Sequence, residues 1–203
     1  MFLEKHYYLN QSNKKHHMNK IILASASPRR KELLMNEGID FIIDASSIDE
    51  TLDMSLPIKE RIAKLAQDKA EPIHLKYPND VVIGADTVVY LDGEIIGKAK
   101  DEEDAYTIHK KMSNKKHTVY TGVAIYIQDQ LITFTDGTDV YFKDTSDMIK
   151  DYIDSKDWIG KAGAYAIQGK ADIFVDHIEG DINTVIGLPV KKVLEVLKEH
   201  GVI

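Results

Sequence analysis

The chain has no cysteine among its 203 residues. This absence excludes disulfides, cysteine-ligated zinc and thiolate nucleophiles, and it is typical of proteins in a reducing cytosol, so we expect a cytoplasmic location. No apolar run is long enough to span a bilayer, which argues against a membrane partner. A Walker loop, a Gly-x-Gly-x-x-Gly fingerprint and a zinc-type His-Glu-x-x-His motif are also missing.

Basic residues are outnumbered, with 26 Lys and Arg against 33 Asp and Glu and a net charge of −7. The balance disfavours a broad binding face for a nucleic acid polymer, so any basic cluster should serve a small anionic ligand. Residues 1–18 are polar and lack the apolar core of a signal peptide. We expect them to form a flexible N-terminal extension, followed by a single domain over residues 19–203.

Strand-like and helix-like segments alternate along the chain, which predicts an α/β fold. We expect a mixed twisted sheet with flanking helices, arranged in two lobes around a central cleft. The predicted strands are 21–23, 39–44, 81–90, 117–128, 131–143 and 173–177, with turns at 92–93 and 129–130. The predicted helices are 28–37, 57–76, 101–113, a helix from Thr145 or Ser146 to Ile153, and 190–200.

The segment from Ala24 to Arg30 (Ala-Ser-Ala-Ser-Pro-Arg-Arg) leads from a strand into a helix. Ser27 suits the N-cap and Pro28 the first helical position, while Gly38 ends the helix. Open backbone N–H groups, two hydroxyls and the guanidinium groups of Arg29 and Arg30 together form an oxyanion site, for which phosphate is the expected ligand. The alternative is an ordinary capped helix with two solvated arginines.

Asp86 follows Gly84-Ala85 inside a run of valines and isoleucines. Burial of a carboxylate without a partner is costly, so this residue either bonds a neighbouring backbone segment or serves chemistry at a cleft. In a cleft it could bind a divalent cation or accept a proton from an attacking water. Thr87 offers a hydroxyl beside it, although successive strand side chains face opposite ways. We favour the functional interpretation.

Other polar positions carry weaker signals. Glu50 lies among polar residues and Lys69 lies late in a predicted helix, so each is most simply a solvated side chain. Lys98 has a better claim because the preceding glycine permits close approach of a ligand. In the segment 160–169, which is dense in small residues, the amide of Gln168 can donate and accept hydrogen bonds at once, as the edge of uracil requires. The alternative is a tight connecting loop.

Taken together, these segments resemble the Maf family of nucleoside triphosphate pyrophosphatases, from about Lys20 to the C-terminal helix. No single short motif decides the resemblance, whereas several collinear motifs make a chance match improbable. They are Ser25 to Arg30, Asp49-Glu50, Lys69-Ala70, Gly84 to Thr87, Gly97-Lys98, His117 to Gly122, Gly160 to Gly169, and Asn183 with Gly187-Leu188-Pro189.

The resemblance implies a Maf/ITPase-like fold and a cytosolic enzyme, often a homodimer, that cleaves a nucleoside triphosphate into the monophosphate and pyrophosphate with the aid of a divalent cation, Mg²⁺ or Mn²⁺. By position, Asp86 is implied as the proton acceptor that activates water, and Arg29, Thr87 and Gln168 as residues of substrate choice. The form of residues 164–169 resembles the dTTP/UTP subgroup, although Ala166 replaces a frequent glycine.

For such a substrate, binding is mainly an electrostatic problem. The expected phosphate ligands are Ser27, Arg29, Arg30, Lys69 and Lys98. Glu50 and Asp86 are the expected metal ligands, because a hard cation prefers carboxylate oxygens. The alternative to an enzyme is a nucleotide-binding regulator of cell division and septum formation that hydrolyses little or nothing.

Overall fold

The structure, a computed structural model, describes residues 20–48 and 51–203. The expected N-terminal extension and Glu50 therefore lie outside the described residues. Within these ranges, seven strands form one mixed sheet in the order β2-β1-β3-β5-β6-β7, with β4 also paired to β3. Their bounds are β1 Ile21–Leu23, β2 Phe41–Ile43, β3 Val81–Leu91, β4 Glu94–Ile96, β5 Lys116–Ile127, β6 Gln130–Phe142 and β7 Val175–Glu179.

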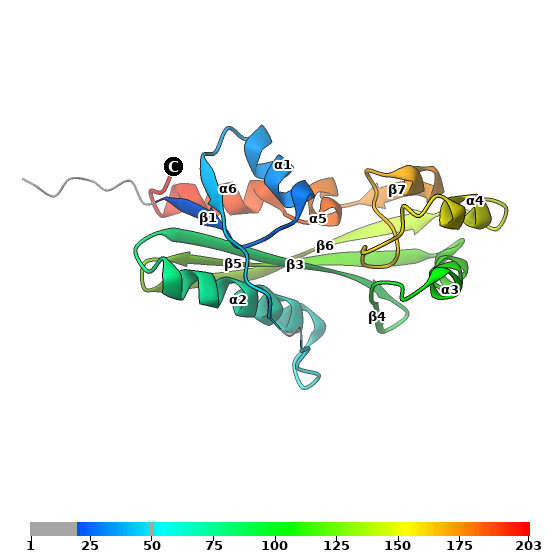
Figure 1. Cartoon of the computed structure of the whole chain (residues 1–203), viewed down its shortest axis with the longest axis horizontal. Coiled ribbons are helices and arrows are strands. Elements are labelled where there is room, and N and C mark those ends of the chain that lie inside the picture. Colours follow the sequence, from blue (N-terminus) through cyan, green and yellow to red (C-terminus); the bar gives the residue numbers. More distant parts are fainter. Residues whose placement is uncertain (1–19, 49–50) are drawn as a thin grey trace, which may run out of the picture.

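Three long antiparallel strands, β3, β5 and β6, run the length of the molecule (Figure 1). At one end of them, β1 pairs in parallel with both β2 and β3. Helix α2 (Ile58–Lys76) covers one face of the sheet there, and α1 (Pro28–Asn36) and α6 (Val190–Glu199) cover the other (Figure 1). The short helix α5 (Ile182–Ile186) follows β7 on the same side as α6.

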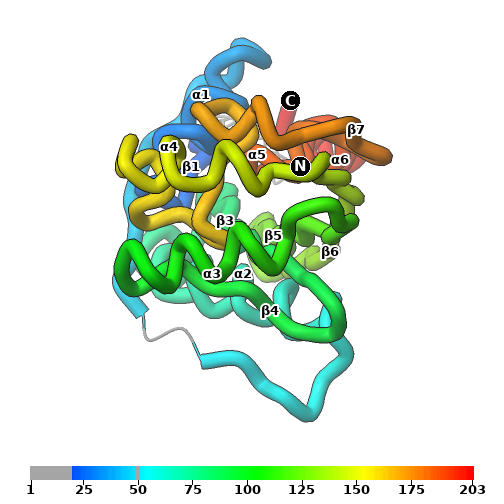
Figure 2. Tube along the Cα trace, turned by 90° about the vertical axis from the view of Figure 1, so that its right-hand side faces the viewer, coloured from blue at the N-terminus to red at the C-terminus, as the bar shows by residue number. Residues whose placement is uncertain are grey.

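The opposite end carries α3 (Glu102–Met112) and α4 (Ile149–Asp154), which lie nearest the viewer in Figure 2. Strand residues alternate between two apolar clusters at the first end. Leu23, Ile83 and Ile125 pack toward α1 and α6, whereas Val82 and Ala124 pack toward α2. A third, aromatic-rich cluster fills the end with α3 and α4. The expected mixed sheet with flanking helices is confirmed, and the described residues include no helix long and apolar enough to cross a membrane.

Most predicted elements are present, although several boundaries were wrong, such as those of the strand predicted at 39–44, which spans Phe41–Ile43. Three of the differences have a clear physical reason. The turn after β5 is Gln128–Asp129, because Ile127 pairs with Gln130 and Gln128 takes a φ of +54°. Helix α4 begins at Ile149 because the Asp144 carboxylate accepts the Ser146 N–H and hydroxyl, which makes a separate turn first. The last strand begins at Val175, since residues 170–174 form a 3₁₀ helix that buries Phe174.

The aromatic-rich cluster buries two histidines, His109 and His117, to which the sequence assigned no role. Phe142 and Phe174 pack edge-on against them. Burial lowers the pKa of both imidazoles, that of His117 from 6.5 to about 4, although the negative charge of Asp139 opposes the shift. Both rings are therefore neutral at pH 7.

We expect acid to destabilise the folded chain through His117. Between pH 6.5 and 4 the unfolded state binds a proton at this ring that the folded state does not, so the free energy of unfolding falls as the pH falls, by up to about 3 kcal/mol from this residue. Well above pH 6.5 the ring is neutral in both states, so this contribution no longer changes with pH. Urea unfolding from pH 7 to pH 4.5 should show a shallower loss for His117→Gln than for the wild type, and equal slopes would contradict the assignment.

Candidate functional site

A cavity of about 400 Å³ opens beside the middle of β3. Every described residue that the sequence nominated for a site lines it: Ser27, Arg29, Arg30, Lys69, Asp86, Thr87, Lys98 and Gln168. They come from α1, α2, β3, the segment after β4 and the 160–169 segment. Residues far apart in the chain are thus brought to one place. The roles that the sequence predicts for them remain predictions.

The cavity exists because strand pairing on one edge of β3 is interrupted. Strand β1 pairs with β3 as far as Ile83, where the Ala24 N–H donates to the Ile83 carbonyl at 2.8 Å. Strand β4 pairs with the same edge of β3 from Val89 onward. In the described part of the chain, no strand covers this edge between Ile83 and Val89. Asp86 and Thr87 lie in that interval.

Helix α1 begins where β1 leaves the sheet. Ser27 is its N-cap and accepts the Arg30 N–H, Pro28 opens the first turn, and Gly38 follows the last turn with a φ of +70°. This geometry agrees with the sequence prediction and follows from the local preferences of serine, proline and glycine. The N-terminal end of the helix borders the cavity.

Arg30 connects three elements around the cavity. Its Nε donates to the Gly187 carbonyl at 2.8 Å, and its two terminal nitrogens donate to Ser25 Oγ and Thr87 Oγ1, each at 3.0 Å. Thr87 Oγ1 is also 2.9 Å from Thr121 Oγ1. The guanidinium therefore fixes α1 against β3 and the end of α5, in addition to placing positive charge at the cavity.

Asp86 is 7% exposed and forms an ion pair with Lys69. The sequence left open whether Asp86 bonds a neighbouring backbone segment. The carboxylate does not need such a bond, because Lys69 of α2 supplies its counter-charge. A partly buried pair of this kind orients both groups, and loss of one partner would leave an uncompensated charge. The sequence did not predict the pair, since nothing in either residue's neighbourhood indicates the other.

Two glycines let α2 lie close enough to the sheet for that ion pair. A Cβ on Gly84 would come within 2.8 Å of the Ala66 carbonyl oxygen, and one on Gly122 within 2.4 Å of the Ile62 carbonyl oxygen. Both obstacles are helix backbone, which cannot rotate away. Because side chains alternate along a strand, Asp86 lies on the same face as Gly84 and so faces α2.

The opposite wall of the cavity is the 160–169 segment. Lys98 forms an isolated β-bridge with Ala162, and the Gly163 N–H donates to the Gly97 carbonyl at 2.9 Å. Gly163 has a φ of +63°, and a Cβ there would meet Val89 at 2.7 Å. These contacts hold the segment against β4 and bring Tyr165 and the exposed Gln168 to the cavity. Tyr165 was not among the nominated residues.

The charges that line the cavity are unequal. Arg29, Arg30, Lys69 and Lys98 are cations, and Asp86 is the only carboxylate among the described lining residues. Such a cavity favours a ligand with several negative charges. Across residues 20–48 and 51–203, no cluster of three or more His, Asp or Glu side chains could hold a metal by itself. Asp86 offers one hard oxygen ligand, which suits Mg²⁺ that a substrate's own phosphates help to bind.

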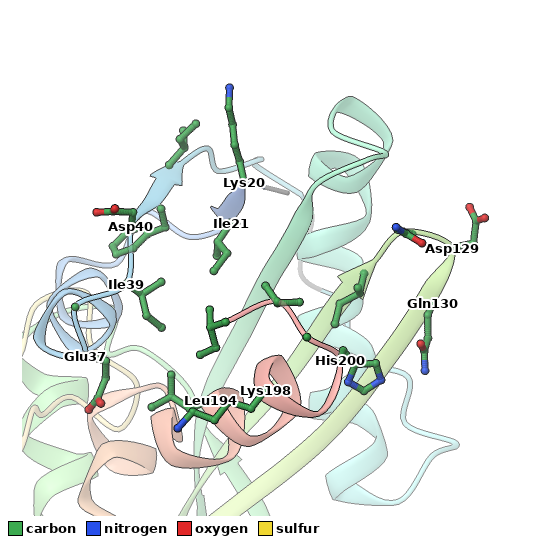
Figure 3. A pocket seen from close by; sticks show the side chains of 18 residues that line it. Lys20, Ile21, Glu37, Ile39, Asp40, Asp129, Gln130, Leu194, Lys198 and His200 are labelled. Carbon is green, nitrogen blue, oxygen red and sulfur yellow. The ribbon is translucent and has the colours of Figure 1, made fainter. Parts of the chain in front are cut away.

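A larger cavity of about 1300 Å³ lies at the far end of the sheet, between β2 and the end of α6. Ile21, Ile39 and Leu194 contribute to its apolar lining (Figure 3). The charged side chains of Lys20 and Asp129 extend outward at its rim (Figure 3). Its other charged lining residues include Glu37, Asp40 and Lys198, so charges of both signs line it. The larger cavity therefore lacks the excess of cations found in the smaller one, which is the candidate site despite its size.

Comparison with known proteins finds a matching family model and similar sequences along most of the chain. The family model described as Maf-like protein matches residues 20–200. A dTTP/UTP pyrophosphatase of Pyrococcus abyssi is 44% identical over 88% of this chain and 95% of its own. A protein of the same name from Bacillus cereus is 42% identical over 91% of this chain and 97% of its own. A solved nucleoside-triphosphatase / dITP/XTP pyrophosphatase from Mycobacterium abscessus has a TM-score of 0.38 at 10% identity, over 61% of this chain and 74% of that chain.

Gly122→Ala tests the close approach of α2. The new methyl group would collide with the helix backbone, so we expect a loss of about 2–3 kcal/mol in the free energy of unfolding and a melting temperature about 5–10 °C lower. Gly97→Ala is the matched control, because a Cβ there meets nothing within 4 Å. Equal melting temperatures for the two variants would show that α2 does not depend on the glycine.

Proposed function

Because the chain belongs to the Maf family, we propose that it hydrolyses dTTP and UTP to the monophosphate and pyrophosphate. The observation that carries the proposal is the single carboxylate, Asp86, in a cavity whose other charged lining residues are cations. Relatives named dTTP/UTP pyrophosphatase that cover about nine-tenths of the chain support it. The proposal includes a cytoplasmic location and a homodimer, as the family resemblance implies.

The cationic side of the cavity would hold the triphosphate. Arg29 and Arg30 lie at the N-terminal end of α1, where backbone N–H groups and the helix dipole favour an anion. Ser27 adds a hydroxyl at the same place. Lys98 approaches from the opposite wall, where Gly97 leaves open space. Phosphate oxygens could therefore be bound from two sides, which orients the bond to be broken.

Asp86 would act as the general base. A water oxygen forms a new bond to phosphorus, its proton passes to the Asp86 carboxylate, and the bridging P–O bond between the α- and β-phosphates breaks, which releases pyrophosphate. Lys69 orients the carboxylate through their ion pair. A positioned general base contributes roughly 10²–10⁴-fold in rate.

A divalent cation, Mg²⁺ or Mn²⁺, fits the chemistry of this site. Asp86 is the described residue that would hold it, together with phosphate oxygens of the substrate, and Glu50 remains the second candidate from the sequence. When bound, the cation would neutralise charge on the phosphates. Asp86 is a candidate for both roles, and the turnover of Asp86→Asn tests whether it has either of them.

Substrate choice would come from the 160–169 segment. Gln168 is exposed at the cavity, and its amide can donate to a pyrimidine carbonyl and accept from the ring N–H. Thr87 and Arg29 would complete the selection from the other wall. A site of this kind rejects a mismatched base strongly, since its polar groups would be left unpaired.

A nucleotide panel with Mg²⁺ tests the activity. We expect pyrophosphate, and not orthophosphate, from dTTP and UTP, with turnover lowered at least 100-fold in Asp86→Asn while nucleotide binding stays measurable. Asp44→Asn is the matched control, because it also disrupts an aspartate–lysine pair but lies away from the cavity. Release of orthophosphate would indicate a phosphatase, and binding without any product would indicate the regulator. Near-normal turnover in Asp86→Asn would remove Asp86 from the mechanism.

Gln168→Glu tests base recognition. Replacement of the amide by an acceptor-only carboxylate should lower kcat/KM for dTTP and UTP by about 10-fold relative to purine nucleotides, because one donor is lost. Gln130→Glu makes the same change at an exposed residue of β6 that does not line the cavity. A nucleotide profile identical to that of the wild type would exclude Gln168 from recognition.

A further inference from the structure

Behind the 160–169 segment lies a set of buried polar rings that the proposed reaction does not use. His109 belongs to α3, His117 to β5 and Tyr152 to α4, and all three are at most 3% exposed. None of the three lines the cavity. Buried polar groups of this kind are costly unless they are hydrogen-bonded, so the partners they bond are informative.

Two of these rings bond the same backbone atom. His109 Nε2 lies 2.9 Å from the Ala164 carbonyl oxygen, and the Tyr152 hydroxyl donates to that oxygen at 3.1 Å. A carbonyl only accepts, so Nε2 of His109 carries the hydrogen. Among the described residues, Nδ1 of this ring has no hydrogen-bond partner. The bond to Ala164 is thus the one polar contact that this buried ring makes in the described part of the chain.

Ala164 needs such support because of its backbone conformation. Its φ is +56°, which a residue with a Cβ adopts at an energetic cost. The residue is fully buried, so its carbonyl could not exchange these bonds for water. The two donors from α3 and α4 therefore hold a backbone geometry that alanine would otherwise leave.

Residues 165–170 connect the hydrogen-bonded Ala164 to the cavity. Tyr165 lines the cavity, and its hydroxyl lies 2.7 Å from His117 Nε2. After Gln168, the Gly169 N–H donates to the Ala166 carbonyl and the Lys170 N–H to Asp157 Oδ2. Gln168 therefore lies between two fixed points, one at Ala164 and Tyr165 and the other at Asp157. A shift at the first point would displace the Gln168 side chain.

We propose that His109 and Tyr152 are positioning residues for nucleobase recognition, which place Gln168 through their shared bonds to the Ala164 carbonyl. The inference rests on the proposed function, because it assigns these residues to the base-recognition side of the same site. Apart from Lys98, the residues proposed to hold phosphate belong to α1 and α2, which are not bonded to Ala164. A defect at Ala164 should therefore weaken selection of the base and leave the phosphate contacts of α1 and α2 unchanged.

Tyr152→Phe and His109→Phe each remove one donor and keep an aromatic ring in the core. We expect KM for dTTP and UTP to rise about 5–10-fold with kcat changed less than threefold, and preference over purine nucleotides to fall by a similar factor. Inhibition by inorganic pyrophosphate should not change. His109→Gln, whose amide can still donate, should restore most of the preference. Tyr141→Phe, which removes a hydroxyl bonded to Glu179 on the surface, is the matched control and should match the wild type.

A merely structural role for the rings predicts a different pattern. Then kcat, pyrophosphate inhibition and thermal stability would decline together and the nucleotide preference would be retained, which would overturn the proposal. If the wild type hydrolyses no nucleotide, the proposed function fails. The positioning role is then judged by calorimetric affinity for dTTP against dATP. An affinity ratio in Tyr152→Phe equal to that of the wild type would overturn it, and a reduced ratio would support it.

Discussion

The interruption in strand pairing along β3 is the constraint on which the rest of the site depends. A strand edge presents backbone polar groups that another strand normally covers. Here β1 covers the edge as far as Ile83 and β4 from Val89 onward, and the interval between them is left to a cavity. Helix α1 starts soon after β1 ends, and the 160–169 segment is hydrogen-bonded to β4. Both walls of the cavity are consequences of this one gap.

The two walls belong to different apolar cores. The wall with Arg29 and Arg30 rests on the cluster beneath α1 and α6, and the wall with Gln168 rests on the aromatic-rich cluster at the other end. The long strands β3, β5 and β6 pass through both ends and set the distance between the walls (Figure 1). In the proposed function, the base and the phosphates held by α1 would thus be bound by separate parts of the fold, each with its own support.

Electrostatics at the cavity depends on how closely α2 approaches the sheet. Gly84 and Gly122 remove the side chains that would hold the helix away, and Lys69 then reaches Asp86. A carboxylate that is 7% exposed needs this counter-charge, since desolvation without a partner would be prohibitive. The same arrangement holds one carboxylate in a fixed orientation among cations, as the proposed proton transfer from water would require.

The sequence by itself determined the local structure: the cap at Ser27 and Pro28, the turn at Gly93 and most strands and helices, because hydrogen bonding and backbone preferences between neighbouring residues decide these features. It also nominated eight of the residues that line the cavity, although not Tyr165. Only the tertiary structure decided their partners. Arg30 with Gly187, Lys69 with Asp86, and His109 with Ala164 depend on distances between elements, and packing of whole helices on the sheet sets those distances.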